Sequence, residues 1–277
     1  MVIKIRTIIS IVAGMRAMRP TILSSPSVGS EDIMTAAIYR QHGDESVIEI
    51  TKRMMRPSPG EDDLLVKVLS CGINPVDVKL RENQLPEWFI PLPKIIGSHM
   101  CGVVVQVGEN VGDDYRVGDR VIAMMPHIWS GWGSAAEFAT VHKTIVAKAP
   151  SNISNIEAGS LPLVGLTVLQ GFQQFVATYP NDTAERSVLI QAAAGGLGSF
   201  AVQYCKNELA MRVYATCSER NMDFVRSLGA DEVINYATTG FEDVCEGMDV
   251  VFDPMAYMYE DRTFRSNVLK KVIPIAN

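Results

Sequence analysis

Length, composition and charge bound the class of protein. A chain of 277 residues, 47% of them hydrophobic, is long enough to bury one large core or two moderate ones. Its formal net charge of −6 gives no general attraction to phosphate backbones, so we expect no nucleic-acid partner. The five cysteines are odd in number and form no CxxC pair, which favours a reducing compartment and argues against a cysteine-rich zinc site.

Residues 1–34 differ in composition from the rest of the chain. The first thirty residues hold no acidic side chain, several serines and threonines, and four basic residues, Lys4, Arg6, Arg16 and Arg19. This composition predicts a leader over residues 1–34 that is similar to organelle transit peptides. The apolar run at residues 8–14 is too short for a bilayer, which needs about 20 residues, so we expect no membrane span. We expect a mitochondrial or other organelle location if the leader is a transit peptide, and a cytoplasmic one if it is a disordered leader with Met34 as an alternative start.

Residues 35–155 show the pattern of β structure. Short apolar runs are separated by Gly, Pro, Asn and Asp, and they lie at residues 63–69, 102–107 and 120–125. This spacing predicts a partly open β-barrel. A helical pattern then begins near residue 151, where Ser154 and Glu157 have the spacing of a capping box. The change of pattern predicts that the first domain spans residues 35–155.

Residues 156–277 alternate between predicted strands and helices. The predicted strands lie at residues 187–193, 212–217, 231–236, 248–255 and 272–277, and the predicted helices between them at 194–210, 221–230 and 260–271. Such alternation is typical of a parallel, doubly wound α/β sheet. Since an open sheet of this kind usually has further strands, we expect the chain to be C-terminally truncated and this second domain to be incomplete.

A glycine-rich loop follows the first strand of the second domain. It consists of Ala194, Gly195, Gly196, Leu197 and Gly198, and it opens the next helix. Glycines allow a pyrophosphate to approach the backbone, and the helix N-terminus offers it free N–H groups and a partial positive charge. The strand-to-helix context predicts a dinucleotide site. The alternative is a tight turn that binds no ligand.

The end of the second predicted strand indicates which dinucleotide is bound. NAD sites commonly place an acidic residue about 20 residues after the glycines, to bind the ribose 2′-hydroxyl. Here Thr216 and Ser218 offer hydroxyl donors, and Arg220 can pair with a 2′-phosphate, which favours NADPH. Two alternatives stay open: Glu219 takes the 2′-hydroxyl instead, or Arg220 is only a solvated charge.

Six segments in order carry a family resemblance. They lie at residues 71–79, 97–108, 116–121, 136–138, 192–198 and 228–236. Together they resemble the medium-chain dehydrogenase/reductase superfamily, in its zinc-independent branch of zeta-crystallin-like quinone oxidoreductases and enoyl reductases. The resemblance implies an α/β protein with a GroES-like barrel domain, a Rossmann domain and an active site in the cleft between them. It also implies a homodimer for the intact family form.

The resemblance bears on metal binding as well. Zinc-dependent members of the superfamily hold their catalytic metal with a Cys and a His, and the matching positions here are Asn74 and Ser98. Both are poor zinc ligands beside a thiolate and an imidazole. His99 and Cys101 lie two residues apart and are interpreted as core or cleft-lining residues. We therefore expect no metal.

Catalytic residues follow from the resemblance. Without zinc, the expected chemistry is hydride transfer to an activated C=C bond or a quinone. The resemblance places Asn74 and Asp77 near the nicotinamide, and it gives Thr167 a position that contacts the nicotinamide end of the cofactor. Ordinary structural roles are the alternatives: a turn for Asn74, a helix cap for Asp77 and a helix hydroxyl for Thr167. Similar enoyl-thioester reductases have a Tyr donor that residues 83–90 lack.

The expected function is an NADPH-dependent, zinc-independent reduction of quinones or α,β-unsaturated carbonyl compounds. Its partner is then a small quinone or enone. The alternatives are an enoyl-thioester reductase and a dinucleotide-binding protein with little turnover because of truncation. The expected cofactor-binding residues are Ala194, Gly195, Gly196, Leu197, Gly198, Thr216, Ser218, Arg220 and Tyr236.

Overall fold

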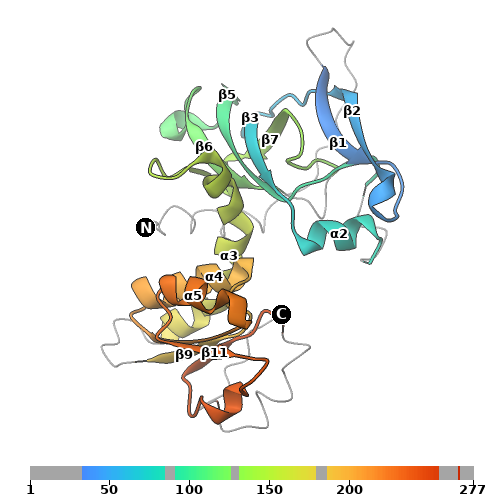
Figure 1. Ribbon diagram of the computed structural model, residues 1–277. Coiled ribbons are helices and arrows are strands. Elements are labelled where there is room, and N and C mark those ends of the chain that lie inside the picture. The colour runs from blue at the N-terminus through green and yellow to red at the C-terminus, as the bar shows by residue number, and fades with distance from the viewer. Residues whose placement is uncertain (1–32, 85–90, 126–130, 179–185, 256–267, 269–277) are drawn as a thin grey trace. The chain divides into compact units, whose positions relative to one another are not determined.

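A computed structural model describes residues 33–84, 91–125, 131–178, 186–255 and 268 (Figure 1). The chain forms two compact units that divide between Leu166 and Thr167. Most of the predicted leader lies outside the described residues, while its last two residues, Ile33 and Met34, belong to the first strand. Among the described residues, no helix is both long and apolar enough to cross a membrane.

The first unit contains two antiparallel sheets. The smaller has the order β2-β1-β4 and consists of β1 (Ile33–Tyr39), β2 (Ile48–Met55) and β4 (Lys94–Ile95). The larger has the order β7-β3-β5-β6-β8 and consists of β3 (Asp63–Gly72), β5 (His99–Val107), β6 (Arg120–Met124), β7 (Phe138–His142) and β8 (Val146–Lys148). A bridge between Ala36 and Ala136 joins the two sheets. This is the barrel-like arrangement that the short apolar runs of residues 35–155 predict.

Side-chain alternation explains how the larger sheet folds. Leu64 and Val66 of β3 point into one core, where they meet Met100 and Val104 of the neighbouring strand β5. All four side chains are fully buried. Burial of apolar side chains on one face is the dominant stabilising term for such a sheet. The three predicted apolar runs coincide with strands, although β3 and β5 extend beyond their runs and β6 ends at Met124, one residue before the end of its run.

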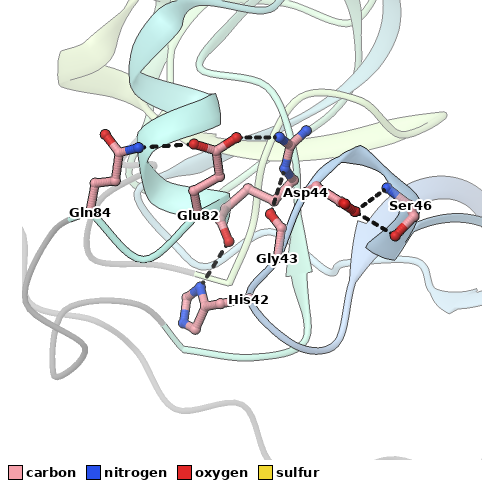
Figure 2. A network of polar contacts seen from close by, with 7 residues as sticks. His42, Gly43, Asp44, Ser46, Glu82 and Gln84 are labelled. Carbon is pink, nitrogen blue, oxygen red and sulfur yellow. Dashed lines mark hydrogen bonds and ion pairs between the residues drawn. The ribbon is translucent and has the colours of Figure 1, made fainter.

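The short helix α2 (Pro75–Arg81) is fixed at both ends. Proline in its first turn has a φ angle suited to helix entry, and the carboxylate of Asp77 accepts a hydrogen bond of 2.8 Å from the backbone N–H of Asn74. At the other end, the Arg81 guanidinium donates to the backbone oxygen of Gly43 and to Glu82. Figure 2 shows this network, in which His42 also contacts the backbone oxygen of Arg81 at 3.2 Å. The position of α2 against the loop that follows β1 is therefore set by polar contacts.

The long helix α3 (Asn155–Thr178) begins where the capping box predicts. The backbone N–H of Ser154 donates to Glu157 at 2.8 Å, and the N–H of Glu157 donates back to the Ser154 hydroxyl at 3.2 Å. Arg120 of β6 holds this helix start by donating to the Asn155 side chain and to the backbone oxygens of Pro150 and Ile153. The division between the two units falls within α3, whereas the sequence predicts a boundary at residue 155.

The second unit is built on a parallel sheet of order β11-β10-β9-β12. Its elements are β9 (Ser187–Ile190), α4 (Gly196–Asn207), β10 (Arg212–Cys217), α5 (Met222–Ser227), β11 (Glu232–Asn235) and β12 (Val250–Phe252). All three strand pairs are parallel, and α4 and α5 pack against the strands (Figure 1). The first four predicted strands are confirmed. The predicted helix at 260–271 and fifth strand at 272–277 lie outside the described residues, apart from Val268.

Short 3-10 turns connect several of these elements. They lie at Glu45–Val47, Gly112–Asp114, Lys143–Ile145, Glu219–Asn221 and Phe241–Asp243. The last of these contributes Phe241 to a core beneath the sheet with Leu189, Ile234, Met248 and Val268. Since helices and turns cover the parallel strands, the strands read as continuous apolar runs in the sequence.

Gly198 packs α4 closely against the turn that precedes it. Its Cα is buried, and a Cβ at this position would overlap the backbone oxygen of Ala192 and come within 2.6 Å of the Cα of Ala193. Both neighbours are backbone atoms, so they cannot rotate away. Only glycine lets the helix begin this close to the end of β9.

We expect Gly198→Ala to destabilise the second unit by about 1 to 3 kcal/mol, the usual cost of overpacking. Gly195→Ala is the matched control, because its Cβ would lie 3.3 Å from the nearest atom, the oxygen of Ala192. Urea unfolding followed by circular dichroism, with hydrogen exchange on α4, measures both effects. Equal unfolding midpoints for the two variants would contradict this account of Gly198.

Candidate functional site

A tight turn links β9 to α4 and exposes the glycine-rich loop. Ala192 has a φ of 51°, and the N–H of Gly195 donates back to its oxygen at 2.9 Å. The N–H of Ala193 donates to the backbone oxygen of Thr216 on the neighbouring strand, also at 2.9 Å. Gly195 is the N-cap of α4, and both it and Gly196 are exposed. The first N–H groups of the helix therefore face a region that a ligand can enter.

A pocket of about 260 Å³ lies beside this loop. It is lined by Ala192, Ala194, Gly195, Cys217, Ser218, Arg220, Asn221 and Tyr236. The fold thus brings the glycine-rich loop together with the carboxyl ends of β10 and β11. In open α/β sheets, ligands bind outside the carboxyl ends of the strands. Of the predicted cofactor residues, the lining includes Ala194, Gly195, Ser218, Arg220 and Tyr236.

Thr216 holds the loop in place. Its hydroxyl donates to the side-chain oxygen of Gln191 at 2.7 Å and accepts from the N–H of Ala192 at 3.2 Å. Thr216 is buried and is not among the lining residues. The sequence predicts a direct hydroxyl donor to the cofactor here, whereas the structure places this hydroxyl within the protein. Gly196, Leu197 and Gly198 likewise shape the helix start without lining the pocket.

The polar rim of the pocket is a set of hydrogen-bond donors. The side-chain amide of Asn221 donates to the Ser218 hydroxyl oxygen at 3.1 Å, which leaves the Ser218 proton free to donate elsewhere. The Arg220 guanidinium and the Tyr236 side chain are exposed beside it. Guanidinium and hydroxyl donors suit a phosphate group, so these residues fit a phosphorylated dinucleotide. Glu219, the alternative candidate for binding a ribose 2′-hydroxyl, does not line the pocket.

Cys217 forms an apolar part of the pocket wall. Its side chain is almost fully buried, and burial raises the pKa of the thiol. A thiol in this state acts as a small hydrophobic group rather than as a nucleophile. Sequence reasoning did not single out Cys217 or Asn221 as site residues, since neither type is diagnostic at the end of a strand.

In the first unit, Asp77 connects α2 to the start of β5. The hydroxyl of Ser98 donates to both carboxylate oxygens, at 2.8 and 2.7 Å, and the backbone N–H of Asn74 donates to the same group. Asp77 and Ser98 are both buried. Asp77 therefore caps the start of α2, which is the structural role that the sequence offered as the alternative to catalysis. Its catalytic role stays a prediction.

Asn74 contacts His99, which sequence analysis interpreted only as a core or cleft-lining residue. The Asn74 amide nitrogen lies 2.9 Å from Nε2 of His99, and Nδ1 of the same ring contacts the backbone oxygen of Gly159 in α3. His99 is 3% exposed. The contact brings together residues 25 positions apart in the chain. No sequence motif predicts this pairing, because it depends on the register between β3 and β5.

Two further buried polar residues surround Asp77. Lys94 of β4 is buried, and this burial lowers the pKa of its ammonium to about 8 while the charge of Asp77 opposes the shift. Tyr39 pairs with Lys94 across β1 and β4. Burial and then the charge of Asp77 raise the pKa of Tyr39. Within the described part of the chain, its hydroxyl has no hydrogen-bond partner.

Thr167 belongs to the second unit. It follows the division within α3, and its side chain is exposed. Asn74 and Asp77 belong to the first unit. The common catalytic role predicted for these three residues therefore stays a prediction.

No group of three or more His, Cys, Asp or Glu side chains suited to a metal ion occurs among the described residues. Both ring nitrogens of His99 already contact protein atoms. Cys101, two residues along β5, is fully buried and lies 4.0 Å from the Asn155 side-chain oxygen. The donor set around Asn74 and Ser98 therefore does not fit zinc.

We expect the purified protein to contain no stoichiometric zinc and to keep its cofactor affinity after chelator treatment, because amide and hydroxyl groups stand where ligands would be needed. Elemental analysis before and after dialysis against chelator measures this. One zinc ion per chain that resists dialysis would contradict it.

A barrel-like antiparallel unit followed by a parallel sheet with a glycine-lined pocket defines a two-unit protein of the dinucleotide-binding type. The family model for the alcohol dehydrogenase GroES-like domain matches residues 60–151. An NADPH-dependent alkenal/one oxidoreductase from Arabidopsis thaliana, named as chloroplastic, is 36% identical over 225 residues, which is 79% of this chain and 57% of that protein. The chain thus contains a GroES-like domain and is similar to quinone oxidoreductases and enoyl reductases of the medium-chain dehydrogenase/reductase superfamily.

Solved structures agree with this placement. The quinone oxidoreductase from Coxiella burnetii matches with a TM-score of 0.74 and 27% identity, over 86% of this chain and 73% of that one. CurK enoyl reductase matches with a TM-score of 0.73 and 26% identity, over 85% and 71%. The predicted α/β class, with a GroES-like domain and a Rossmann-type sheet, is confirmed. The chain spans less than two thirds of the Arabidopsis relative's length.

Proposed function

We propose that this protein is an NADPH-dependent, zinc-independent reductase of quinones or α,β-unsaturated carbonyl compounds. The observation that carries the proposal is the pocket in which the glycine-rich loop meets Ser218, Arg220 and Tyr236. Those groups suit a dinucleotide with a 2′-phosphate. The Arabidopsis relative is named as NADPH-dependent and as acting on alkenals and alkenones, which supports both the cofactor and the substrate class.

The residues of this chain have separate tasks in the proposed reaction. Bound NADPH would supply a hydride to the substrate. Ala194, Gly195 and the start of α4 would hold the pyrophosphate, and Ser218 with Arg220 would hold the 2′-phosphate. Thr216 keeps the loop in the shape that this requires, through Gln191 and Ala192. Asn74, Asp77 and Thr167 stay our candidates for groups near the nicotinamide, and most of the rate would come from holding the two reactants together.

Location and assembly belong to the same proposal. The Arabidopsis relative is named as chloroplastic, and the first thirty residues of this chain are basic and free of acidic side chains. We place the protein in an organelle on these two grounds. A homodimer is proposed from the family resemblance.

Purified protein mixed with NADPH and a panel of acceptors tests the activity. We expect loss of the reduced-nicotinamide absorbance with small quinones or enones, and slower loss with an enoyl thioester. Faster turnover of the thioester would favour the alternative that this protein is an enoyl reductase. The structural similarity to CurK enoyl reductase is the reason to include this substrate. Saturable NADPH binding without turnover of any acceptor would instead identify a dinucleotide-binding protein.

Arg220→Ala should weaken NADPH binding by about 1.5 to 3 kcal/mol, the range for hydrogen bonds to charged groups, and should leave NADH binding nearly unchanged. Arg212→Ala is the matched control, because Arg212 is an exposed arginine at the opposite end of β10 and does not line the pocket. Fluorescence titrations with both cofactors measure the effect. Equal losses for NADPH and NADH would rule out a 2′-phosphate contact.

A further inference from the structure

Two residues of the pocket lining, Ser218 and Asn221, lie at helix starts that their side chains do not cap. Ser218 is the N-cap of the 3-10 turn at Glu219–Asn221, and Asn221 is the N-cap of α5. Ser and Asn are strongly preferred at such positions, because their side-chain oxygen accepts a hydrogen bond from a backbone N–H of the first turn. Neither side chain makes this bond here. Both are therefore available for another role.

The two side chains form a hydrogen bond with each other instead. The side-chain amide of Asn221 donates to the Ser218 hydroxyl oxygen at 3.1 Å. The backbone N–H of Asn221 also donates to the backbone oxygen of Ser218, at 2.9 Å. Asn221 thus holds both the backbone and the side chain of Ser218. Residues that depart from a favourable local pattern in this way are expected at functional sites more than elsewhere.

This pairing determines what Ser218 offers to the pocket. A serine hydroxyl has one proton and two lone pairs, and the amide of Asn221 occupies one of the lone pairs. Among the described residues, the Ser218 hydroxyl donates to no other group, so its proton is available to a ligand in the pocket that Ser218 lines. In the reverse arrangement, with the Asn221 oxygen accepting from Ser218, the protein itself would use that proton.

A phosphate and a ribose hydroxyl need different partners at this position. A phosphate carries negative charge at neutral pH and mainly accepts hydrogen bonds, so it requires donors. A ribose 2′-hydroxyl can donate its own proton, and NAD sites commonly provide a carboxylate to accept it. The Arg220 guanidinium, which can only donate, lies in the same lining, whereas the carboxylate of Glu219 does not. Donors at this edge of the pocket therefore favour a phosphate over a hydroxyl.

We propose that Asn221 is a positioning residue for cofactor choice. By donating to the Ser218 oxygen, it keeps the Ser218 proton for the 2′-phosphate of a dinucleotide, and it acts through Ser218 rather than by contacting the phosphate. This inference rests on the proposed function, since it requires a dinucleotide in the pocket. It adds an indirect contribution to the direct contacts proposed for Ser218 and Arg220.

Adenosine 2′,5′-bisphosphate and AMP differ only in the 2′-phosphate, and calorimetric titration of the whole protein with both tests this role without turnover. Asn221→Ala leaves the Ser218 hydroxyl unoriented, so the affinity for the bisphosphate should fall about three- to tenfold, while that for AMP stays within about twofold.

Asn221→Asp has nearly the same shape, but its carboxylate takes the Ser218 proton and repels a phosphate. The affinity for the bisphosphate should therefore fall by about thirtyfold or more, and the preference for NADPH over NADH should fall with it. Asn207→Asp is the matched control, because it adds the same charge at an exposed position at the far end of α4, outside the pocket lining. It should leave the ratio of the two affinities unchanged.

A double-mutant cycle separates positioning from direct contact. In a Ser218→Ala background, Asn221→Ala should cause no further loss of bisphosphate affinity, because Asn221 acts through Ser218. A further loss as large as in the unchanged background would overturn the positioning role. Equal losses for the bisphosphate and AMP in Asn221→Asp would also overturn it, since the pair would then only hold the turn. If the unchanged protein shows no preference for the 2′-phosphate, the cofactor assignment of the proposed function fails, and this inference fails with it.

Discussion

The buried carboxylate of Asp77 is the group on which the first unit's candidate site depends. A carboxylate loses its hydration when buried, and that cost must be met by hydrogen bonds and by nearby positive charge. Asp77 receives hydrogen bonds from the Ser98 hydroxyl and from the backbone N–H of Asn74, the N-cap residue of its helix. The buried ammonium of Lys94 lies close enough for the Asp77 charge to act on its pKa. One charge thereby fixes α2 and, with it, the backbone of Asn74.

A comparable constraint organises the second unit, but it uses neutral groups. The Thr216 hydroxyl connects the end of β10 to the turn after β9, through Gln191 and Ala192. This turn must reverse within a few residues so that α4 can begin beside the sheet, and Ala192 takes a positive φ of 51° to do so. The same reversal leaves the first N–H groups of α4 pointing to the pocket. The reversal of the chain after β9 therefore both completes the fold of this unit and shapes its pocket.

The sequence predicts the helices, strands and caps that depend mainly on residues close together in the chain. The capping box of Ser154 and Glu157 and the strand at Arg212–Cys217 were both predicted, because each depends on neighbouring residues. The sequence did not predict the partnership of His99 with Asn74, nor the burial of Lys94, since both depend on which strands pair and in what register. The hydrogen bond from the Thr216 hydroxyl to Gln191, the residue after β9, is a further contact that depends on strand pairing and that the sequence does not predict.

Asn74 and Ser98 stand where similar zinc-dependent proteins have metal ligands, so the helix and strand that carry them must be held in place without a metal ion. A structural zinc ion can contribute on the order of 10 kcal/mol or more to holding its ligands. A neutral hydrogen bond contributes about 1 kcal/mol, so no single contact here can replace a metal. The chain instead uses several anchors that converge on α2: the bonds of Asp77 at its start, those of Arg81 at its end, and the contact of His99 with the side chain of Asn74. Each anchor is weak, but they come from different strands and loops, so together they fix the position of α2 and of its N-cap residue Asn74.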